Sequence, residues 1–431
     1  MRFPQVVLVK QHSDIPAITN VADVVRQEVA RLNLQVKRGA RIAIAVGSRG
    51  IDNHALIVRT LAEELKAWGA EPFIVPAMGS HGGASAEGQV MVLETLGITE
   101  KSTGVPIRSS MEVVQLGTTA SGIPVFIDKT AAQADGIVLV HRVKAHTDFG
   151  GPIESGMMKL ITIGLGKHKG AQIAHRFAVQ RGFNQVIPVV ARYVLKKIPV
   201  LFGMGLVENF YHETAVISAA KPENLEETEK ELLRKAKTMM ARIPFGRLDL
   251  VVVPEIGKTI SGTGMDTNVV GRIYNVAEPE AEFPQYTRIV ALDLADDTYG
   301  NAVGIGMADL ATRRLVDKID FKATAINCLT GACPEKGRIP ITLDSAREVI
   351  AAALMICGPV EPEGVKMVWI KNTLELDQFY ISRVLIPASV ANPNLEILSD
   401  LMELPFDAEG NLAWITPCRT EHINLRNQAG I

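Results

Sequence analysis

Short uncharged runs of apolar residues alternate along this chain with longer amphipathic segments. The clearest run is RIAIAV at 41–46, and similar runs occupy 71–76, 123–127 and 136–141. Runs of this length without polar alternation are typical of strands covered on both faces. Residues 53–68 carry apolar side chains near helical spacing, which predicts a helix between the first two of these strands.

The same alternation starts again in the second half. A charged amphipathic helix is predicted over 222–242, followed by the helix-breaking turn Ile243–Gly246. Beyond that turn, strands are predicted over 248–253, 288–294, 323–328 and 366–371, with a helix over 345–356. Strand–helix alternation in both halves predicts an α/β fold with two open, mainly parallel sheets covered by helices.

We therefore expect two domains. The first, residues 1–245, would be the catalytic and cofactor-binding domain, and the second, residues 246–431, would be an α/β domain that closes the active site. Ligand sites favour clefts between domains, so the active site is expected in the cleft between the two.

Composition narrows the class of protein. The 431 residues are 47% hydrophobic and 21% charged, and 45 basic against 47 acidic side chains give a net charge of −2. Lysine and arginine never form a run longer than two, so neither a nucleic-acid nor a membrane-surface partner is expected. The N-terminus lacks the pattern of a signal peptide and no apolar stretch approaches a membrane span, which predicts a cytoplasmic protein.

The four cysteines, Cys328, Cys333, Cys357 and Cys418, form no C-x-x-C pair and match no zinc-ligand spacing. We expect reduced, mostly buried thiols.

The common nucleotide motifs are absent. The chain contains no G-x-x-x-x-G-K-[ST], and its glycine pairs do not complete G-x-G-x-x-G, so a P-loop or a standard dinucleotide site is not supported. The turn 47–50, which includes Ser48 and Arg49, follows a predicted strand and precedes a predicted helix. Its backbone amides suit a single phosphate, although a plain tight turn explains the same residues.

Histidines concentrate in one segment. Four of the nine lie between His141 and His175, in HRVKAHTDFGGPIESGMMKLITIGLGKHKGAQIAHR. His81 stands between a serine and two glycines at a predicted strand end, and His146 follows the apolar 136–141 strand in a polar setting. Ordinary loop or helix-capping roles for His81 and His146 stay open on this evidence, and His168, between two lysines, is expected to be a solvated helix residue.

The residue types suit proton transfer beside a metal. Two histidines on opposite sides of a substrate could treat either enantiomer, because imidazole accepts and returns a proton near neutral pH. A third imidazole could hold a borderline metal such as nickel. A lysine could carry a covalently attached cofactor, and an arginine could pair with a carboxylate.

In the order and context of these residues the chain resembles the nickel-dependent lactate racemase family. The matching positions are Arg49 after the early strand, His81 in a G-x-H turn, His146 before a glycine-rich loop, Lys159 after that loop, and His175 sixteen residues beyond the lysine. In the second half, the family's P-L-D-x-N element is echoed by Gly264-Met265-Asp266-Thr267-Asn268.

The resemblance implies specific roles. His81 and His146 would be the alternating acid and base, and His175 would bind nickel. Lys159 would carry the nickel-pincer nucleotide (pyridinium-3-thioamide-5-thiocarboxylic acid mononucleotide nickel) through a covalent bond, with Ser48 and Arg49 also at the cofactor. Arg49 would orient the substrate carboxylate, and cofactor-biosynthesis enzymes would be maturation partners. The implied reaction is racemisation or epimerisation of a 2-hydroxy acid by hydride transfer to that cofactor.

The chain departs from the lactate enzymes in two places. The loop between His146 and Lys159 is longer, and the stretch after Asn268 has Val270, Gly271, Arg272 and Tyr274 where they place tyrosine, glutamine and a substrate-contacting lysine. Arg272 is therefore a candidate for a second substrate carboxylate. Lactate, malate and sugar acids all stay open as substrates.

Two other classes of function compete with the isomerase. One is a zinc-type hydrolase or lyase using the same histidines, for which Asp148 or Glu154 would have to complete the metal site. The other is a non-catalytic protein that binds a nucleotide or hydroxy acid, which predicts no covalent adduct.

Overall fold

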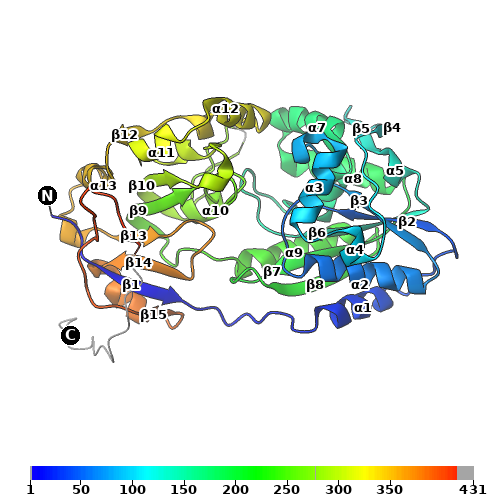
Figure 1. Ribbon diagram of the computed structural model, residues 1–431, viewed down its shortest axis with the longest axis horizontal. Coiled ribbons are helices and arrows are strands. Elements are labelled where there is room, and N and C mark those ends of the chain that lie inside the picture. The colour runs from blue at the N-terminus through cyan, green and yellow to red at the C-terminus, as the bar shows by residue number, and fades with distance from the viewer. Residues whose placement is uncertain (1, 277, 415–431) are drawn as a thin grey trace. The chain divides into compact units, whose positions relative to one another are not determined.

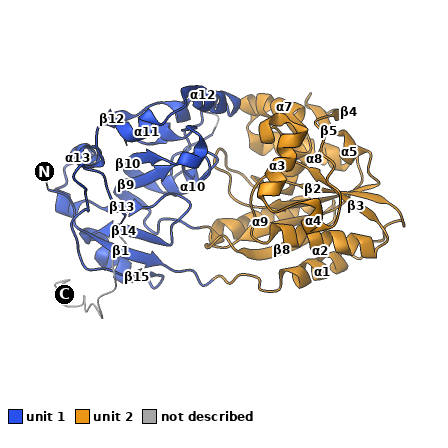
Figure 2. Ribbon diagram, viewed as in Figure 1, with its two compact units in different colours: residues 1–14, 241–431 blue, residues 15–240 orange. Residues whose placement is uncertain are grey.

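The computed structural model describes residues 2–276 and 278–414 and divides them into two compact units (Figure 2). One unit comprises residues 15–240. The other contains residues 241–431 together with residues 1–14. The first fourteen residues thus group with the second half of the chain, although a first domain of 1–245 was expected. The reason is strand pairing, because β1 (Val6–Gln11) is hydrogen-bonded to β14 (Gln378–Ser382) and β15 (Leu395–Ile397).

The unit of residues 15–240 contains a five-stranded sheet in the order β3-β2-β6-β7-β8. Its strands are β2 (Arg41–Val46), β3 (Glu71–Pro76), β6 (Gly136–Arg142), β7 (Val200–Glu208) and β8 (Thr214–Ala220). The pairings from β3 to β7 are parallel, and only β8 runs antiparallel to its neighbour. The predicted strands 41–46, 71–76 and 136–141 therefore lie side by side in this sheet.

Helices cover both faces of this sheet (Figure 1). Alternate residues of β2 show the division, because Ile42 and Ile44 pack in one apolar cluster while Ala43 and Ala45 pack in another. The first cluster contains α1 (Val21–Arg31) and α2 (His54–Ala67). The second contains α7 (Lys167–Arg181), α8 (Phe183–Leu195) and α9 (Leu225–Met239). Burial of both faces explains the continuous apolar runs in the sequence.

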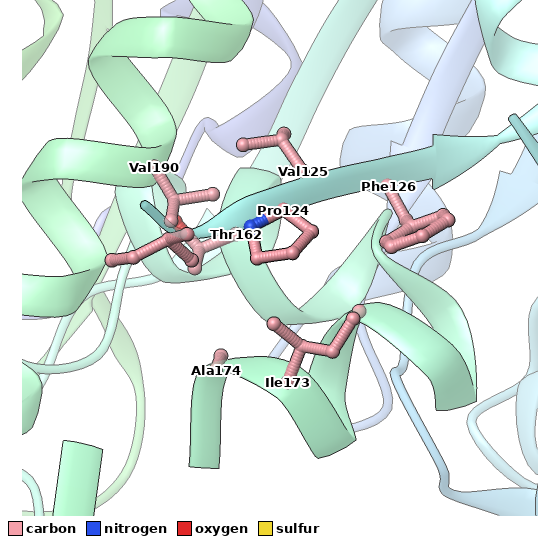
Figure 3. A pocket seen from close by; sticks show the side chains of 9 residues that line it. Pro124, Val125, Phe126, Thr162, Ile173, Ala174 and Val190 are labelled. Atoms are coloured by element: carbon pink, nitrogen blue, oxygen red, sulfur yellow. The ribbon is translucent and has the colours of Figure 1, made fainter. Parts of the chain in front are cut away.

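A two-stranded antiparallel ribbon, β4 (Val113–Thr118) and β5 (Pro124–Asp128), packs beside α7. A small apolar pocket lies at this contact, and Figure 3 shows Ile173 and Ala174 of α7 facing Pro124 and Phe126. It is lined by Ile123, Pro124, Val125, Phe126, Thr162, Gly170, Ile173, Ala174 and Val190. None of the predicted site residues is among them, and no side chain in this lining titrates, so the pocket has no evident role in catalysis.

The other unit contains an eight-stranded mixed sheet in the order β12-β11-β10-β9-β13-β14-β1-β15. The remaining strands are β9 (Arg247–Ile256), β10 (Gln285–Leu294), β11 (Leu310–Thr312), β12 (Ile341–Leu343) and β13 (Met367–Ile370). Pairing is parallel from β12 to β13 and antiparallel from β13 to β15. The α/β class with mainly parallel pairing is confirmed.

The strand predicted over 323–328 is wrong. These residues lie in helix α12 (Phe321–Thr330), whose first turn is capped because the Asp320 side chain accepts a hydrogen bond from the Ala323 backbone N–H. Within α12 only Thr324 and Cys328 are buried, four residues apart, as on one face of a helix. The helix predicted over 345–356 is α13 (Ala346–Met355).

Cys328, Cys333 and Cys357 are buried, as expected, and none forms a disulfide with another described residue, while Cys418 lies outside the described residues. No described helix has both the length and the apolar character needed to cross a bilayer.

Candidate functional site

Three loops that carry predicted site residues leave the same edge of the five-stranded sheet. Strands β3, β2 and β6 are adjacent and parallel, so their carboxyl ends lie together. Ser48 and Arg49 follow β2, His81 follows β3, and His146 follows β6. This is the edge at which parallel α/β sheets bind ligands.

The first pair in contact is Ser48 and His81. The Ser48 Oγ lies 2.5 Å from His81 Nδ1, and the His81 side chain is exposed. The backbone of the His81 turn is held by Gln89, a buried residue of α3 (Ala86–Thr95) whose Nε2 donates to Gly79 O at 3.0 Å and to His81 O at 3.4 Å.

A buried lysine fixes Gln89 in turn. Lys167 has no exposed surface, and its Nζ donates to Gln89 Oε1 at 2.8 Å and to Pro76 O at 2.6 Å, with Asp128 Oδ2 at 3.3 Å. Burial lowers the pKa of Lys167 and raises that of Asp128. Two hydrogen-bond acceptors and a nearby carboxylate oxygen nevertheless suit the charged ammonium. The network therefore ties α7 to the end of β3 and to the His81 turn.

His146 is held on three sides. Its backbone N–H donates to Glu154 Oε2 at 2.7 Å, and its Nδ1 accepts from the backbone N–H of Asp148 at 3.0 Å. Its ring stacks on Phe149, with centroids 4.3 Å apart and planes 28° apart. Its Nε2 contacts Lys159 Nζ. The longer loop noted in the sequence therefore closes on itself through Glu154 and delivers an oriented imidazole.

Lys159 ends the short helix α6 (Met157–Lys159), which continues directly into a π-helical turn over Leu160–Gly164. Glu229 of α9 caps the N-terminus of α6, because its Oε2 accepts a hydrogen bond from the Met158 backbone N–H at 2.8 Å. Single π-helical turns are frequent at functional sites. Lys159 Nζ lies over the Phe149 ring, 5.8 Å from its centroid.

His175 lies on α7, close to the same aromatic pair. Its ring meets Phe183 edge to face with centroids 4.9 Å apart, and Phe183 stacks on Phe149 with centroids 4.9 Å apart. His146, Lys159 and His175 thus all pack against Phe149 or Phe183. Three of the predicted functional groups, distant in sequence, are brought together by one pair of rings.

The pKa values of Lys159 and His175 are both lowered, which shifts each group toward its neutral form. Burial lowers the pKa of Lys159 to about 8, with Asp148 and Glu154 opposing and Arg49 adding to the shift. Burial, then the charge of Lys159, lowers the pKa of His175 to about 4. A neutral imidazole has a lone pair available for a metal, and a neutral amine is a nucleophile.

Arg49 is exposed, yet its guanidinium lies among enough protein that desolvation lowers its pKa, with Arg142 adding to the effect and Asp148 opposing it. Arginine stays charged in any case. Nearby, a Cβ on Gly47 would lie 3.2 Å from His141 Cε1, so the turn after β2 packs closely on that ring. Burial, followed by the charge of Lys159, lowers the pKa of His141 to about 3.

Two predicted features lie in the other compact unit. Arg272 donates to Met307 O at 2.7 Å and to Asp309 Oδ2 at 2.8 Å, contacts that favour a structural role over substrate binding. Asp266 caps the short helix α10 (Thr267–Val270) by accepting from the Asn268 backbone N–H at 2.9 Å. His168, on α7, is exposed as expected.

Among the described residues, no group of three His, Cys, Asp or Glu side chains is arranged to hold a metal ion. Glu154, one of the two carboxylates that could have completed a zinc site, is already engaged. Its Oε1 accepts from the Gly151 N–H and pairs with Lys237, while its Oε2 accepts from His146.

Several residues that shape the site were not predicted from the sequence. Phe149 was read only as part of the loop, and Phe183, Gln89, Lys167 and Glu229 were not singled out. The signal available for Phe149 was an aromatic residue in a loop otherwise rich in glycine and polar groups. Nothing in the sequence marks Glu229, which looks like any charged residue of its amphipathic helix.

Two comparisons with known proteins find similarity to lactate racemase. Residues 7–185 match the family model of the lactate racemase N-terminal domain. The solved structure of the lactate racemase apoprotein from Thermoanaerobacterium thermosaccharolyticum covers 85% of this chain and 100% of its own, with a TM-score of 0.51 and 14% identity, which shows a shared fold. A glycosyltransferase, SsfS6 of Streptomyces sp. SF2575, has a TM-score of 0.17 and supports no argument. No curated protein matches the sequence.

Proposed function

We propose, because residues 7–185 belong to the lactate racemase N-terminal domain family, that this chain is a racemase or epimerase of a 2-hydroxy acid. The observation that carries the proposal is the convergence of His146, Lys159 and His175 on the Phe149–Phe183 pair. The loop that presents His81 leaves the same edge of the sheet as the loop that presents His146. The family supports an isomerase of the racemase type, and the residues below extend that to a mechanism.

The residues fit the nickel-pincer nucleotide of this family. Lys159, with a pKa of about 8, is a suitable amine for its covalent attachment, and His175, neutral at physiological pH, is a suitable nickel ligand. Ser48 and Arg49, on the turn after β2, would contact the same group. When bound, the cofactor supplies hydride acceptance and return at C2 of the substrate, which avoids forming a poorly stabilised carbanion beside a carboxylate.

The protein's part is to position the substrate and move the hydroxyl proton. Arg49 is charged and exposed, and would bind the substrate carboxylate. His81 and His146 stand on separate loops, after β3 and β6, so one could take the hydroxyl proton of one enantiomer and the other that of its mirror image. The Ser48 contact fixes the His81 ring, and the Phe149 stack fixes the His146 ring.

The first test uses protein co-expressed with the cofactor-biosynthesis enzymes, analysed by intact mass and by nickel content. We expect a covalent adduct that is lost in Lys159→Ala and nickel that is lost in His175→Ala. The exposed neighbours Lys169 and His168 on α7 provide matched controls, and their alanine variants should keep both. Wild-type protein with neither adduct nor nickel would refute the mechanism and favour the non-catalytic binder.

The second test follows single enantiomers of lactate, malate and sugar acids by loss of optical rotation. We expect the loaded wild type to racemise or epimerise at least one of them. His81→Gln and His146→Gln should each slow the reaction by a factor on the order of 100 or more, because each removes one acid–base group. A single-histidine variant that racemises at the wild-type rate would exclude that histidine from proton transfer.

A further inference from the structure

Both ring nitrogens of His146 have a partner in the structure, and the two partners differ in kind. Nδ1 accepts a hydrogen bond from the backbone N–H of Asp148 at 3.0 Å. A backbone N–H can only donate, so Nδ1 carries no proton. The other nitrogen, Nε2, contacts Lys159 Nζ.

The identity of the proton donor in that second contact follows from simple counting. A neutral imidazole carries one proton, and if Nδ1 has none, it is on Nε2. The Nε2–H then donates to Lys159 Nζ, and only an uncharged amine has a lone pair to accept it. We propose that His146 is a positioning residue that stabilises the neutral amine form of Lys159, the form able to attack an acyl or thioacyl carbon, before any cofactor is attached.

The surroundings of His146 fix this orientation of the ring. Phe149 stacks on it, and Glu154 anchors its backbone N–H. Turning the ring over by 180° would place carbons at both nitrogen positions, and the hydrogen bond from Asp148 and the contact with Lys159 would both be lost. The observed orientation is therefore the one that satisfies the neighbouring groups.

The charged groups near Lys159 do not cancel the effect of burial on its pKa. Arg49 disfavours an ammonium, whereas Asp148 and Glu154 favour one. Glu154 is paired with Lys237, and the Asp148 carboxylate lies on the Nδ1 side of the His146 ring, with Oδ2 4.0 Å from Nδ1. His141 and His175 have pKa values far below 7 and add no charge. Burial outweighs the two carboxylates, and the pKa of Lys159 falls to about 8.

The lowered pKa increases the fraction of Lys159 that is present as the neutral, nucleophilic amine. With a pKa of about 8 instead of 10.5, the neutral fraction of Lys159 at pH 7 rises by a factor of roughly 300. The inference rests on the proposed function only for the identity of the electrophile, because the proton arrangement follows from the contacts of His146.

The direct test is nuclear magnetic resonance on wild-type protein labelled with ¹⁵N-histidine and expressed without the cofactor-biosynthesis enzymes. Two-bond ¹H–¹⁵N spectra distinguish the two imidazole tautomers, and they are recorded at pH 9, where a Lys159 with a pKa of about 8 is mostly neutral. His146→Gln identifies the signals of His146, and His81→Gln is the matched control that should leave them in place. We expect an Nε2–H ring with an unprotonated Nδ1. An Nδ1–H ring, or an imidazolium, would overturn the proposal.

A second measurement on the same protein is independent of any variant. Acetylation by N-hydroxysuccinimidyl acetate forms the N–C bond as the ester C–O bond breaks, with loss of N-hydroxysuccinimide and transfer of the ammonium proton to buffer. Peptide mass spectrometry gives the rate at Lys159 and at the exposed Lys169 as pH is raised. We expect the Lys159 midpoint near pH 8 and the Lys169 midpoint near the ordinary lysine value of about 10.4. Equal midpoints would overturn the proposal.

Failure here is distinguishable from failure of the proposed function. If the tautomer is Nδ1–H while the loaded enzyme still carries adduct and nickel and racemises, only the role of His146 toward Lys159 is wrong. If the tautomer is Nε2–H but no adduct or racemisation is found in loaded protein, the nucleophilic lysine stands and its electrophile is a different acyl compound.

Discussion

Glu229, which accepts a hydrogen bond from the helix that ends at Lys159, leads to a prediction of how the free energy of unfolding depends on pH. Its side chain is fully buried, its Oε2 accepts from the Met158 backbone N–H, and its Oε1 has no partner in the structure. Burial raises the pKa of this carboxyl from 4.5 to about 7, against the opposing effect of the Met158 and Met157 amides. The replacement Glu229→Gln keeps the shape and an acceptor oxygen but cannot ionise.

The size of the effect follows from the shift. A rise of about 2.5 pH units costs the ionised folded form about 3 kcal/mol at 1.36 kcal/mol per unit. The folded state holds the Glu229 proton more tightly than the unfolded chain does. The contribution of this proton to the free energy of unfolding is therefore fully present below pH 4.5 and is lost as pH rises through about 7. Relative to wild type, Glu229→Gln should therefore become more stable by about 3 kcal/mol between pH 4.5 and pH 8.

The assay is urea-dependent hydrogen exchange followed by mass spectrometry on peptides from residues 15–240. Peptide resolution is needed because two compact units are not expected to unfold as one two-state system. Comparing the variant with wild type at each pH cancels the intrinsic pH dependence of exchange. A stability difference that stays constant from pH 4.5 to pH 8 would show that Glu229 does not titrate in this range and would refute the reasoning.

Three other predictions follow from single contacts. Lys167→Met should destabilise residues 15–240 by about 3–5 kcal/mol, because it leaves Asp128 buried without its cation. Adding Asp128→Asn should recover part of that loss. Equal stability of the single and double variants in urea would contradict the ion pair. Gly264→Ala should cost at least roughly 2 kcal/mol, since φ is +77° and the new Cβ would lie 1.9 Å from Val303 O; an unchanged melting temperature would count against the close contact. Arg272→Ala should lower stability while leaving KM unchanged in loaded enzyme, and a large rise in KM would restore Arg272 as a substrate ligand.

The local sequence pattern predicted strands correctly where both faces of a sheet are buried, because such strands consist almost entirely of apolar residues. The strands β2, β3 and β6 were predicted from such runs. The segment 323–328 failed because it is short, apolar and β-branched in part. The Asp320 cap and the burial of a single face make this segment a helix. A short run of apolar residues in the sequence does not distinguish such a helix from a buried strand.

The composition of the site was likewise readable, but its arrangement was not. Histidine and lysine in this order limited the chemistry, because few other side chains transfer protons or form covalent adducts near neutral pH. The sequence could not show that Phe149 and Phe183 gather His146, Lys159 and His175, since those contacts join residues up to 34 positions apart.

The sequence by itself therefore determined the α/β class and the set of reactive side chains, because both depend on residue type and local period. Only the tertiary structure decided that β1 joins the second unit, that Arg272 is engaged by Asp309, and that His146 accepts from Asp148 while facing Lys159. Strand pairing and proton positions depend on which groups meet in space, and that information is spread over the whole chain.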